Sequence, residues 1–147
     1  MKKILCLTLL LLMLVSLTAC GNKNELQDGY YTAQAASFNY GWKEYITIMV
    51  KGGSIVSVEY NAENPSGFIK SWDNAYMQTM LHSNGTYPNE YTRNYAGQLL
   101  EKQQGGTSID AITGATSSCS SFQKLAAAVL EQARQGDSSI VFVDTSH

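Results

Sequence analysis

The segment at residues 118–135 has the strongest amphipathic pattern in this sequence. Its apolar residues recur at i, i+3, i+4, i+7, i+8 and i+11, so they share one face of a helix. These residues are Phe122, Leu125, Ala126, Val129, Leu130 and Ala133. Such a helix is stable only where another element covers its apolar face, so the rest of the chain must supply a matching surface. Gly136 marks the expected end of the helix.

A hairpin earlier in the chain offers that surface. We expect strands at residues 44–50 and 54–60, joined by Lys51-Gly52-Gly53, which is typical of a short hairpin connection. Apolar side chains alternate along both strands, and we expect one buried face made of Ile46, Ile48, Val50, Val56, Val58 and Tyr60. A first strand is expected at residues 30–33, and a closing strand at 140–143.

Two further helices are expected between the hairpin and the last helix. The first begins near residue 71 and stops at Asn84-Gly85, and the second begins at Pro88 and ends at Gly105-Gly106. The residues that recur at every fourth position are Trp72, Tyr76 and Met80, then Tyr91, Tyr95 and Leu99. The order β-β-β-α-α-α-β predicts an α+β fold, with a small antiparallel sheet and a central hairpin packed against two or three helices.

The first nineteen residues have the features of a secretory signal peptide. Lys2 and Lys3 precede an apolar run at residues 4–15, which is too short for a permanent membrane span. Leu17-Thr18-Ala19-Cys20 resembles the bacterial lipobox, which implies that Cys20 becomes the lipidated first residue of the mature protein. An ordinary cleavage site beside a chance Cys is the alternative. Several acyl chains on one residue would hold the protein stably at a membrane.

We therefore expect a signal peptide at 1–19, a lipidated Cys with a flexible tether at 20–27, and one domain at 28–147. Without Lys2 and Lys3 the chain has eight basic and twelve acidic residues, so no basic patch argues for nucleic acid. Cys119 is the single Cys of the expected domain, which excludes an internal disulfide and a Cys-rich metal site. We expect it to be a small buried residue.

Motifs of common hydrolase and nucleotide sites are absent from the sequence. It has only two histidines, His82 and His147, and neither a G-x-S-x-G elbow nor a G-x-x-x-x-G-K-[ST] loop. We expect His82 at the surface near a helix end. The nine tyrosines either fill a small core or, in part, line a groove for a planar ring, and the sequence does not choose among them.

The residues just before the last helix form the densest functional candidate. Asp110-Ala111-Ile112-Thr113-Gly114-Ala115-Thr116 places two very small residues ahead of a hydroxyl. Glycine permits a positive φ there, and free N–H groups at a helix start favour an anion. The alternative is an ordinary helix start, with Thr116, Ser117 or Ser118 as N-cap and a capping box from Ser120 to Gln123. Capping explains one hydroxyl, which we expect to be Ser117 or Ser118, but not the whole run.

This run resembles the flavinylation signature of the FMN-binding domain family, which is Asp, two variable residues, Ser or Thr, then Gly-Ala-Thr. The family includes flavin-bearing components of the sodium-pumping NADH:quinone oxidoreductase and of related electron-transport complexes, as well as small bacterial lipoproteins. D-G-Y-Y-T and G-A-T-S-S-x-x-x-F-x-x-L also match, so the likeness covers about residues 29–136. The helical segment at 71–104 is absent from the shortest members, so no pocket residues there follow from the family.

The resemblance implies that a flavin transferase uses FAD and Mg²⁺ to attach FMN to Thr116 through a phosphoester. Asp110 and Thr113 would serve recognition or hold the loop, and Gly114 and Ala115 would leave the hydroxyl accessible. Ser117 would lie beside the cofactor. The linked phosphate keeps a negative charge, which a helix N-terminus favours.

The expected function is that of a lipid-anchored electron carrier on the extracytoplasmic face of the cell membrane. The flavin would carry the redox chemistry, so we expect a carrier rather than an enzyme with catalytic side chains of its own. Its expected partners are the flavin transferase, a membrane electron donor and an external electron acceptor. The alternatives are a lipid-anchored cell-envelope binding module with an unmodified Thr116, and a protein that binds FMN non-covalently.

Overall fold

The computed structural model describes residues 25–146 and has four strands, three α-helices and two short 3-10 helices in that range. The strands are β1 (Gly29–Ala35), β2 (Lys43–Lys51), β3 (Ser54–Glu63) and β4 (Val141–Val143). The helices are η1 (Lys70–Trp72), α2 (Asn74–Asn84), α3 (Pro88–Lys102), η2 (Gln103–Gly105) and α4 (Thr116–Gln135). The α+β class expected from the sequence is confirmed.

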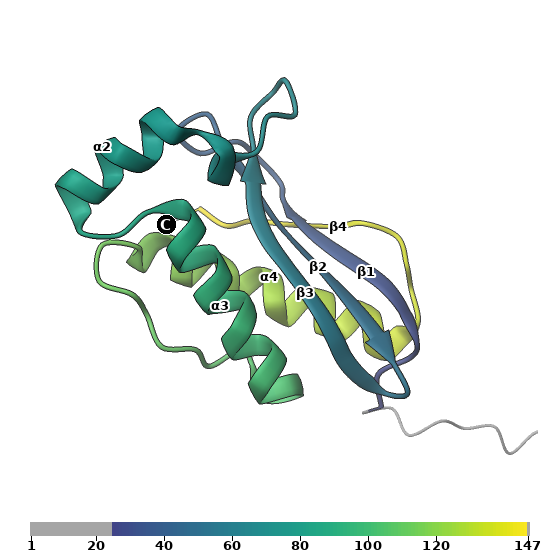
Figure 1. Cartoon of the computed structure of the whole chain (residues 1–147). Coiled ribbons are helices and arrows are strands. Elements are labelled where there is room, and N and C mark those ends of the chain that lie inside the picture. Colours follow the sequence, from purple (N-terminus) through teal and green to yellow (C-terminus); the bar gives the residue numbers. More distant parts are fainter. Residues whose placement is uncertain (1–24, 147) are drawn as a thin grey trace, which may run out of the picture.

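The strands form one sheet in the order β3-β2-β1-β4. β1, β2 and β3 pair antiparallel, whereas β4 pairs parallel to β1. The sheet is therefore mixed, although mostly antiparallel. The long helix α4 returns the chain from one end of the sheet to the other, and a helical crossover of this kind leaves β4 parallel to β1 (Figure 1). The closing strand is shorter than expected, because Ile140 is exposed and lies outside it.

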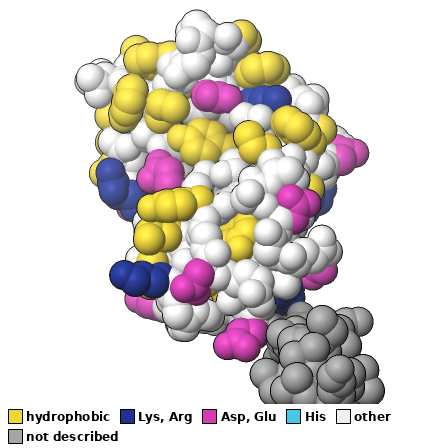
Figure 2. Space-filling model, turned by 90° about the vertical axis from the view of Figure 1, so that its right-hand side faces the viewer, with side chains coloured by type: hydrophobic (Ala, Val, Ile, Leu, Met, Phe, Trp, Pro, Cys, Tyr) yellow, Lys and Arg dark blue, Asp and Glu magenta, His cyan; other side chains and the backbone are white. Residues whose placement is uncertain are grey.

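The apolar stripe of α4 packs on one face of the sheet, as its spacing predicted. All six stripe residues are fully buried, together with Ile46, Ile48 and Val50 of β2. The opposite face of the sheet is polar in part, with one hydrogen bond between the Thr32 and Thr47 hydroxyls at 2.9 Å. Figure 2 shows the side of the molecule that carries β1 and β4, where hydrophobic side chains are interspersed with charged ones. The hydrophobic core therefore lies between the sheet and the helices.

The buried face expected for β3 is partly wrong. Tyr60 is buried and Val58 packs against the core, but Val56 is 46% exposed and Ile55 is buried in its place. The cause is a bulge in the β2–β3 pairing between Met49 and Val50, which inserts one residue and reverses the alternation near the hairpin turn. The turn itself is at Gly52 and Gly53, both with positive φ, as a two-residue hairpin requires.

The helices between β3 and α4 differ from their expected bounds at their ends. The first helical turn after β3 is η1, and α2 begins only at Asn74, where the Asp73 side chain accepts from the Tyr76 N–H at 3.0 Å. Gly85 ends α2 in the left-handed conformation, and Pro88 is the first residue of α3, both as predicted. α3 ends at Lys102, before η2, and not at Gly105-Gly106.

α2 lies apart from the rest of the fold. None of its residues is buried, and it projects away from the sheet (Figure 1). α3 packs on β3 instead and buries Tyr91, Tyr95 and Leu99, as expected from their spacing. Leu26 and Gln27 fall in the expected tether, yet Leu26 is buried in the core and the Gln27 N–H donates to the Ala133 carbonyl. The signal peptide and Cys20 lie outside the described residues.

Candidate functional site

The loop before α4 is held from inside by the hydroxyl of Tyr95. This phenol accepts a hydrogen bond from the Ile112 N–H at 3.1 Å and donates one to the Ala115 carbonyl at 3.1 Å. A further bond from the Ala115 N–H to the Ile112 carbonyl closes a turn around Thr113 and Gly114. Burial raises the pKa of Tyr95 to about 12, even though its bond from Ile112 acts in the opposite direction. The phenol therefore stays protonated and can bind both backbone groups.

Gly114 is the point where α2 contacts this loop. Its φ is +86°, and the side-chain amide of Asn84 donates to its carbonyl at 3.2 Å. A Cβ at Gly114 would overlap the backbone carbonyl of Asn84. Glycine is thus required twice, for the left-handed conformation and for the close approach of the end of α2.

The expectation that Ser117 or Ser118 caps α4 is wrong. The helix starts at Thr116, its N-cap is Ala115, and no side chain caps it. The reason is that the Ala115 carbonyl already accepts from the Cys119 N–H, so the helix begins ahead of the hydroxyls. The proposed capping box at 120–123 accordingly lies inside the helix. The first-turn N–H groups at 116–118 have no intrahelical acceptor and remain available to an anion.

A pocket of about 640 Å³ opens beside this helix start. This volume falls within the range of small-molecule sites. Five segments build it: the β1–β2 loop with the start of β2, η1 with α2, the start of α3, the loop before α4 with the start of α4, and the residues after β4. Its described lining residues are Ser37, Phe38, Asn39, Tyr40, Trp42, Glu44, Lys70, Tyr76, Met80, Asn84, Tyr91, Gly114, Ala115, Ser117, Ser118, Ser121, Thr145 and Ser146.

One wall of the pocket combines aromatic rings with a cation. Trp42 and Tyr76 meet edge to face, with ring centroids 6.0 Å apart. The Lys70 Nζ lies 4.9 Å from the Tyr76 centroid and 5.8 Å from that of Trp42. Burial lowers the pKa of Lys70, but electrostatic interactions with Tyr91, Tyr76 and Glu44 and a hydrogen bond with the Tyr76 side chain outweigh it, so its pKa lies above its ordinary value. The ammonium is therefore charged at physiological pH.

Glu44 and two tyrosines connect this wall to α4. The Tyr60 hydroxyl donates to Glu44 at 2.8 Å and also contacts the Ser118 carbonyl at 3.0 Å. Burial and the neighbouring Glu44 charge raise the pKa of Tyr60 well above its usual range. Burial likewise raises the pKa of Tyr91, against the effects of Lys70 and of a hydrogen bond with the Ser118 side chain. Both phenols thus stay protonated at physiological pH; Tyr91 lines the pocket, and Tyr60 lies behind its lining.

The pocket brings together some residues expected from the sequence and leaves others outside. Gly114, Ala115 and Ser117 line it. Thr116 lies between them as the exposed first residue of α4, at the rim and outside the lining set. Asp110 and Thr113 are exposed on the outer side of the loop. The Asp110 side chain is 96% exposed and lies 3.9 Å from Lys102.

Sequence reasoning missed the aromatic wall. Phe38, Tyr40 and Trp42 fall within five residues between β1 and β2, too many aromatics for a plain connection, and this was the available signal. Lys70 had no such signal, because nothing in the sequence places this residue beside Trp42. The helical segment at 71–104, which the family likeness left open, supplies Tyr76 and Tyr91.

Cys119 is buried, as expected, and does not line the pocket. Burial raises the pKa of its thiol, against the effect of a hydrogen bond with Tyr95.

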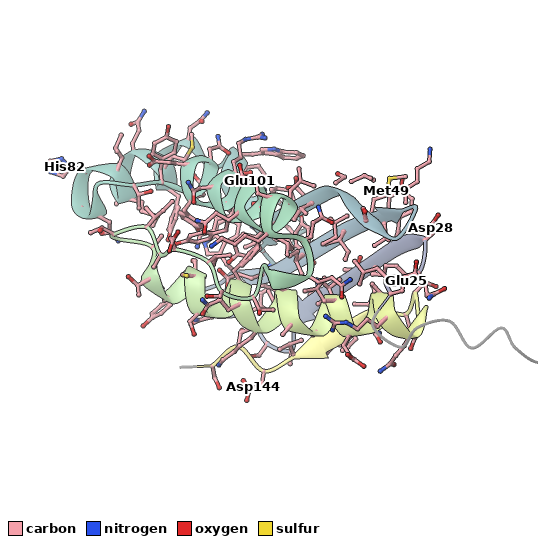
Figure 3. All side chains as sticks on the ribbon, turned by 90° about the horizontal axis from the view of Figure 1, so that it is seen from below. Glu25, Asp28, Met49, His82, Glu101 and Asp144 are labelled. Carbon is pink, nitrogen blue, oxygen red and sulfur yellow. The ribbon has the colours of Figure 1, made fainter. Side chains whose placement is uncertain are left out.

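His82 is exposed in the last turn of α2 (Figure 3). Between residues 25 and 146, no group of His, Cys, Asp or Glu suits a metal ion. In the same range, no helix has both the length and the apolar content needed to cross a bilayer.

The chemistry of the pocket fits FMN. Aromatic side chains suit a flat, electron-poor ring system, and the Lys70 cation suits the negative charge that such a ring gains on reduction. The open N-terminus of α4 suits a phosphate. Bound there, FMN would supply one- and two-electron redox chemistry. The residues that would hold it are the Gly114–Ser118 segment at the phosphate and Trp42, Tyr76 and Lys70 at the ring.

Comparison with known proteins supports FMN as the cofactor. The chain is 36% identical to the 15 kDa lipoprotein of Treponema pallidum over 124 residues, which is 84% of this chain and 86% of the relative. A crystal structure of a Clostridium perfringens protein matches with a TM-score of 0.76 at 36% identity, over 81% of this chain and 98% of the other. A solution structure of a Clostridium thermocellum protein matches with a TM-score of 0.51 at 31% identity, over 74% and 92%. Residues 40–131 match the model of the FMN-binding domain, and the chain belongs to that family.

Proposed function

We propose that this FMN-binding protein is a lipid-anchored, extracytoplasmic electron carrier whose FMN is attached to Thr116. The observation that carries this proposal is the position of Thr116. It is the exposed first residue of α4, at the rim of an aromatic pocket, and it is the last residue of the signature run. A phosphate on its hydroxyl would lie at the free N–H groups of the helix start.

Attachment needs a nucleophile that a modifying enzyme can reach. The Thr116 hydroxyl forms the ester bond to the flavin-side phosphorus of FAD, the bond between the two phosphates breaks, AMP leaves, and the hydroxyl proton is lost. A Mg²⁺-dependent flavin transferase catalyses this exchange. The exposure of Asp110, Thr113 and Thr116 supports the proposal, since an enzyme can contact all three without unfolding the domain.

Anchoring is proposed from the lipobox at Leu17-Thr18-Ala19-Cys20. The name of the Treponema pallidum relative, a lipoprotein, supports it. A covalent flavin suits such a location, because a diffusible cofactor is lost outside the cell. The carrier receives electrons from a donor in the membrane and passes them to an external acceptor. Replacement of Cys20 by Ala should move the protein from the membrane fraction to the soluble fraction.

The test of covalent attachment is co-expression with and without a flavin transferase. The denatured wild-type protein should show flavin fluorescence in a gel and the mass increase of one FMN, only when the transferase is present. Thr116→Ala should abolish both signals, and Ser117→Ala, one residue away in the same helical turn, should keep them. Flavin that binds the native protein but leaves on denaturation would establish non-covalent binding instead. A wild-type protein without flavin under both conditions would favour the cell-envelope binding module.

A further inference from the structure

Lys70 is the one positively charged residue among the described residues that line the pocket, and Glu44 is the one negatively charged residue. Lys70 begins η1, directly after the short antiparallel bridge between Glu63 and Ile69. Its backbone is therefore fixed to the end of β3, and its side chain reaches into the pocket from there. This placement makes the cation a built part of the site and not a mobile surface lysine.

Within residues 25–146, no carboxylate lies within 4 Å of the Lys70 ammonium. Glu44 is the one carboxylate that lines the pocket, and its charge acts on Lys70 from beyond 4 Å, while it accepts a hydrogen bond from Tyr60 at 2.8 Å. Trp42 and Tyr76 lie against the ammonium with their rings, and the Tyr76 side chain is also hydrogen-bonded to it. The cation is thus half-buried among aromatic side chains, with no carboxylate in direct contact among the described residues of the site. Such an arrangement favours a ligand that brings negative charge.

The phosphate of FMN would have other donors. The N–H groups at the start of α4, together with Ser117, would favour an anion beside the exposed Thr116. Lys70 instead belongs to the wall of ring-sized side chains formed with Trp42 and Tyr76. The two features therefore serve different parts of one ligand, the phosphate at α4 and the planar ring at the aromatic wall.

We propose that Lys70 faces the isoalloxazine ring and stabilises the negative charge that the ring gains on reduction. This inference rests on the proposed function. Lys70 is a positioning and tuning residue, because a fixed cation binds the reduced, anionic ring more tightly than the neutral oxidised ring. The preference raises the midpoint potential of the flavin above the value it would have without Lys70.

The experiment uses the full chain, flavinylated by co-expression with the transferase. Lys70→Met removes the charge and keeps the length of the side chain, and Lys70→Arg keeps the charge. Lys43→Met is the matched control. The Lys43 ammonium also lies over two rings, 5.6 Å from the Phe38 centroid and 5.2 Å from the Phe142 centroid, but Lys43 does not line the pocket. The midpoint potential of the bound flavin is measured by dye-coupled titration. Sulfite affinity gives a second readout, because its adduct also leaves negative charge on the ring.

In Lys70→Met, the preference of the protein for reduced over oxidised flavin should fall at least tenfold. This corresponds to a fall in the midpoint potential of at least about 30 mV for a two-electron couple. Sulfite should bind at least tenfold more weakly. Lys70→Arg and Lys43→Met should stay within threefold of the wild type in both readouts. Attachment to Thr116, read as gel fluorescence, should be unchanged in all variants. If Lys70→Met does not fold, as judged by circular dichroism, Lys70→Gln replaces it.

The proposal is overturned if Lys70→Met carries flavin with unchanged potential and sulfite affinity, while covalent attachment in the wild type still stands. Loss of attachment with an unchanged potential in the remaining flavin would assign Lys70 to the phosphate and would also overturn it. An equal shift in Lys43→Met would show a general effect of surface charge. A wild-type protein that carries no flavin at all would refute the proposed function, and this inference with it.

Discussion

The side chain of Asn84 donates to the carbonyl of Gly114 at 3.2 Å, and the Asn84 backbone lies where a Cβ at Gly114 would be. This contact joins the end of α2 to the turn that precedes α4. It gives a structural reason for glycine at this position in this chain. The residue serves the fold of the loop.

Gly114→Ala should destabilise the protein and lower its flavin content. The left-handed φ costs about 1–2 kcal/mol for a residue with a Cβ, and the overlap with Asn84 adds to it. Gly67→Ala is the control, because Gly67 has a similar φ of +79° and open space around it. Chemical denaturation should show a loss of about 1 kcal/mol for Gly67→Ala and at least twice that for Gly114→Ala. Equal losses would mean that the Asn84 contact contributes nothing.

Asp110→Asn should separate recognition from stability. The Asp110 side chain is almost fully exposed and its ion pair with Lys102 is long, so the unfolding free energy should change by less than about 0.5 kcal/mol. Covalent flavin should nevertheless fall at least tenfold, because in the proposed function the transferase recognises this carboxylate. Lys102→Met removes this ion pair together with the hydrogen bond from Lys102 to the Ser108 carbonyl at 2.8 Å, and should keep full attachment. Normal flavinylation of Asp110→Asn would remove Asp110 from the recognition element.

Stability should fall as the pH rises above about 10, and Tyr95 should account for part of the fall. The folded protein holds the Tyr95 proton up to a pKa of about 12, whereas an unfolded tyrosine loses it near 10. Unfolding therefore releases a proton in this window, and the free energy of unfolding decreases with pH. Cys119, with a raised pKa, acts in the same direction from a lower pH.

The measurement is the urea midpoint at pH 8, 10 and 11.5. At pH 8 the free energy of unfolding of Tyr95→Phe should be about 1–2 kcal/mol lower than that of the wild type, because the variant loses both loop hydrogen bonds. As the pH rises, its free energy of unfolding should then decrease less steeply than that of the wild type. Tyr30→Phe, at a residue that is 64% exposed, should follow the wild-type slope. Parallel curves for the wild type and Tyr95→Phe would show that Tyr95 does not titrate in this range.

α2 should exchange its amide hydrogens faster than any other α-helix of residues 25–146. It buries no residue, whereas α3 and α4 bury five and eight. Local opening of α2 thus exposes little apolar surface and costs little free energy. Hydrogen exchange followed by mass spectrometry should show α2 amides labelled orders of magnitude sooner than those of α4. Similar protection in α2 and α4 would indicate that the Asn84–Gly114 contact holds α2 as firmly as a core helix.

The parts of the fold that depend on regular spacing could be predicted from the sequence. The α4 stripe, the α3 stripe with Tyr91 and Tyr95, and the Gly52-Gly53 turn all follow from period and turn chemistry. The parts that depend on contacts between distant segments could not. The bulge that exposes Val56 arises from strand pairing and has no local signal.

The candidate site divides in the same way. The run from Asp110 to Thr116 is contiguous, so the sequence contains it completely. The N-cap at Ala115 depends instead on a turn that Tyr95 stabilises from another helix. Lys70 and Trp42 are 28 positions apart and meet only because β2 and β3 are paired and η1 follows the end of β3.

The two ends of β2 determine how far the pocket lies from the point where the chain enters the domain. Near the hairpin, the Gly53 N–H donates to Asp28, so the entry of the chain lies at the Lys51 end of the strand. The pocket lies at the other end, beside Glu44. The nine residues of β2 span about 27 Å, whereas the five steps from Cys20 to Glu25 extend at most about 18 Å. In the proposed lipoprotein, an upright domain holds its flavin pocket beyond the lipid headgroups and turned away from them. A donor buried in the bilayer would then need an extramembrane part of its own to reach it.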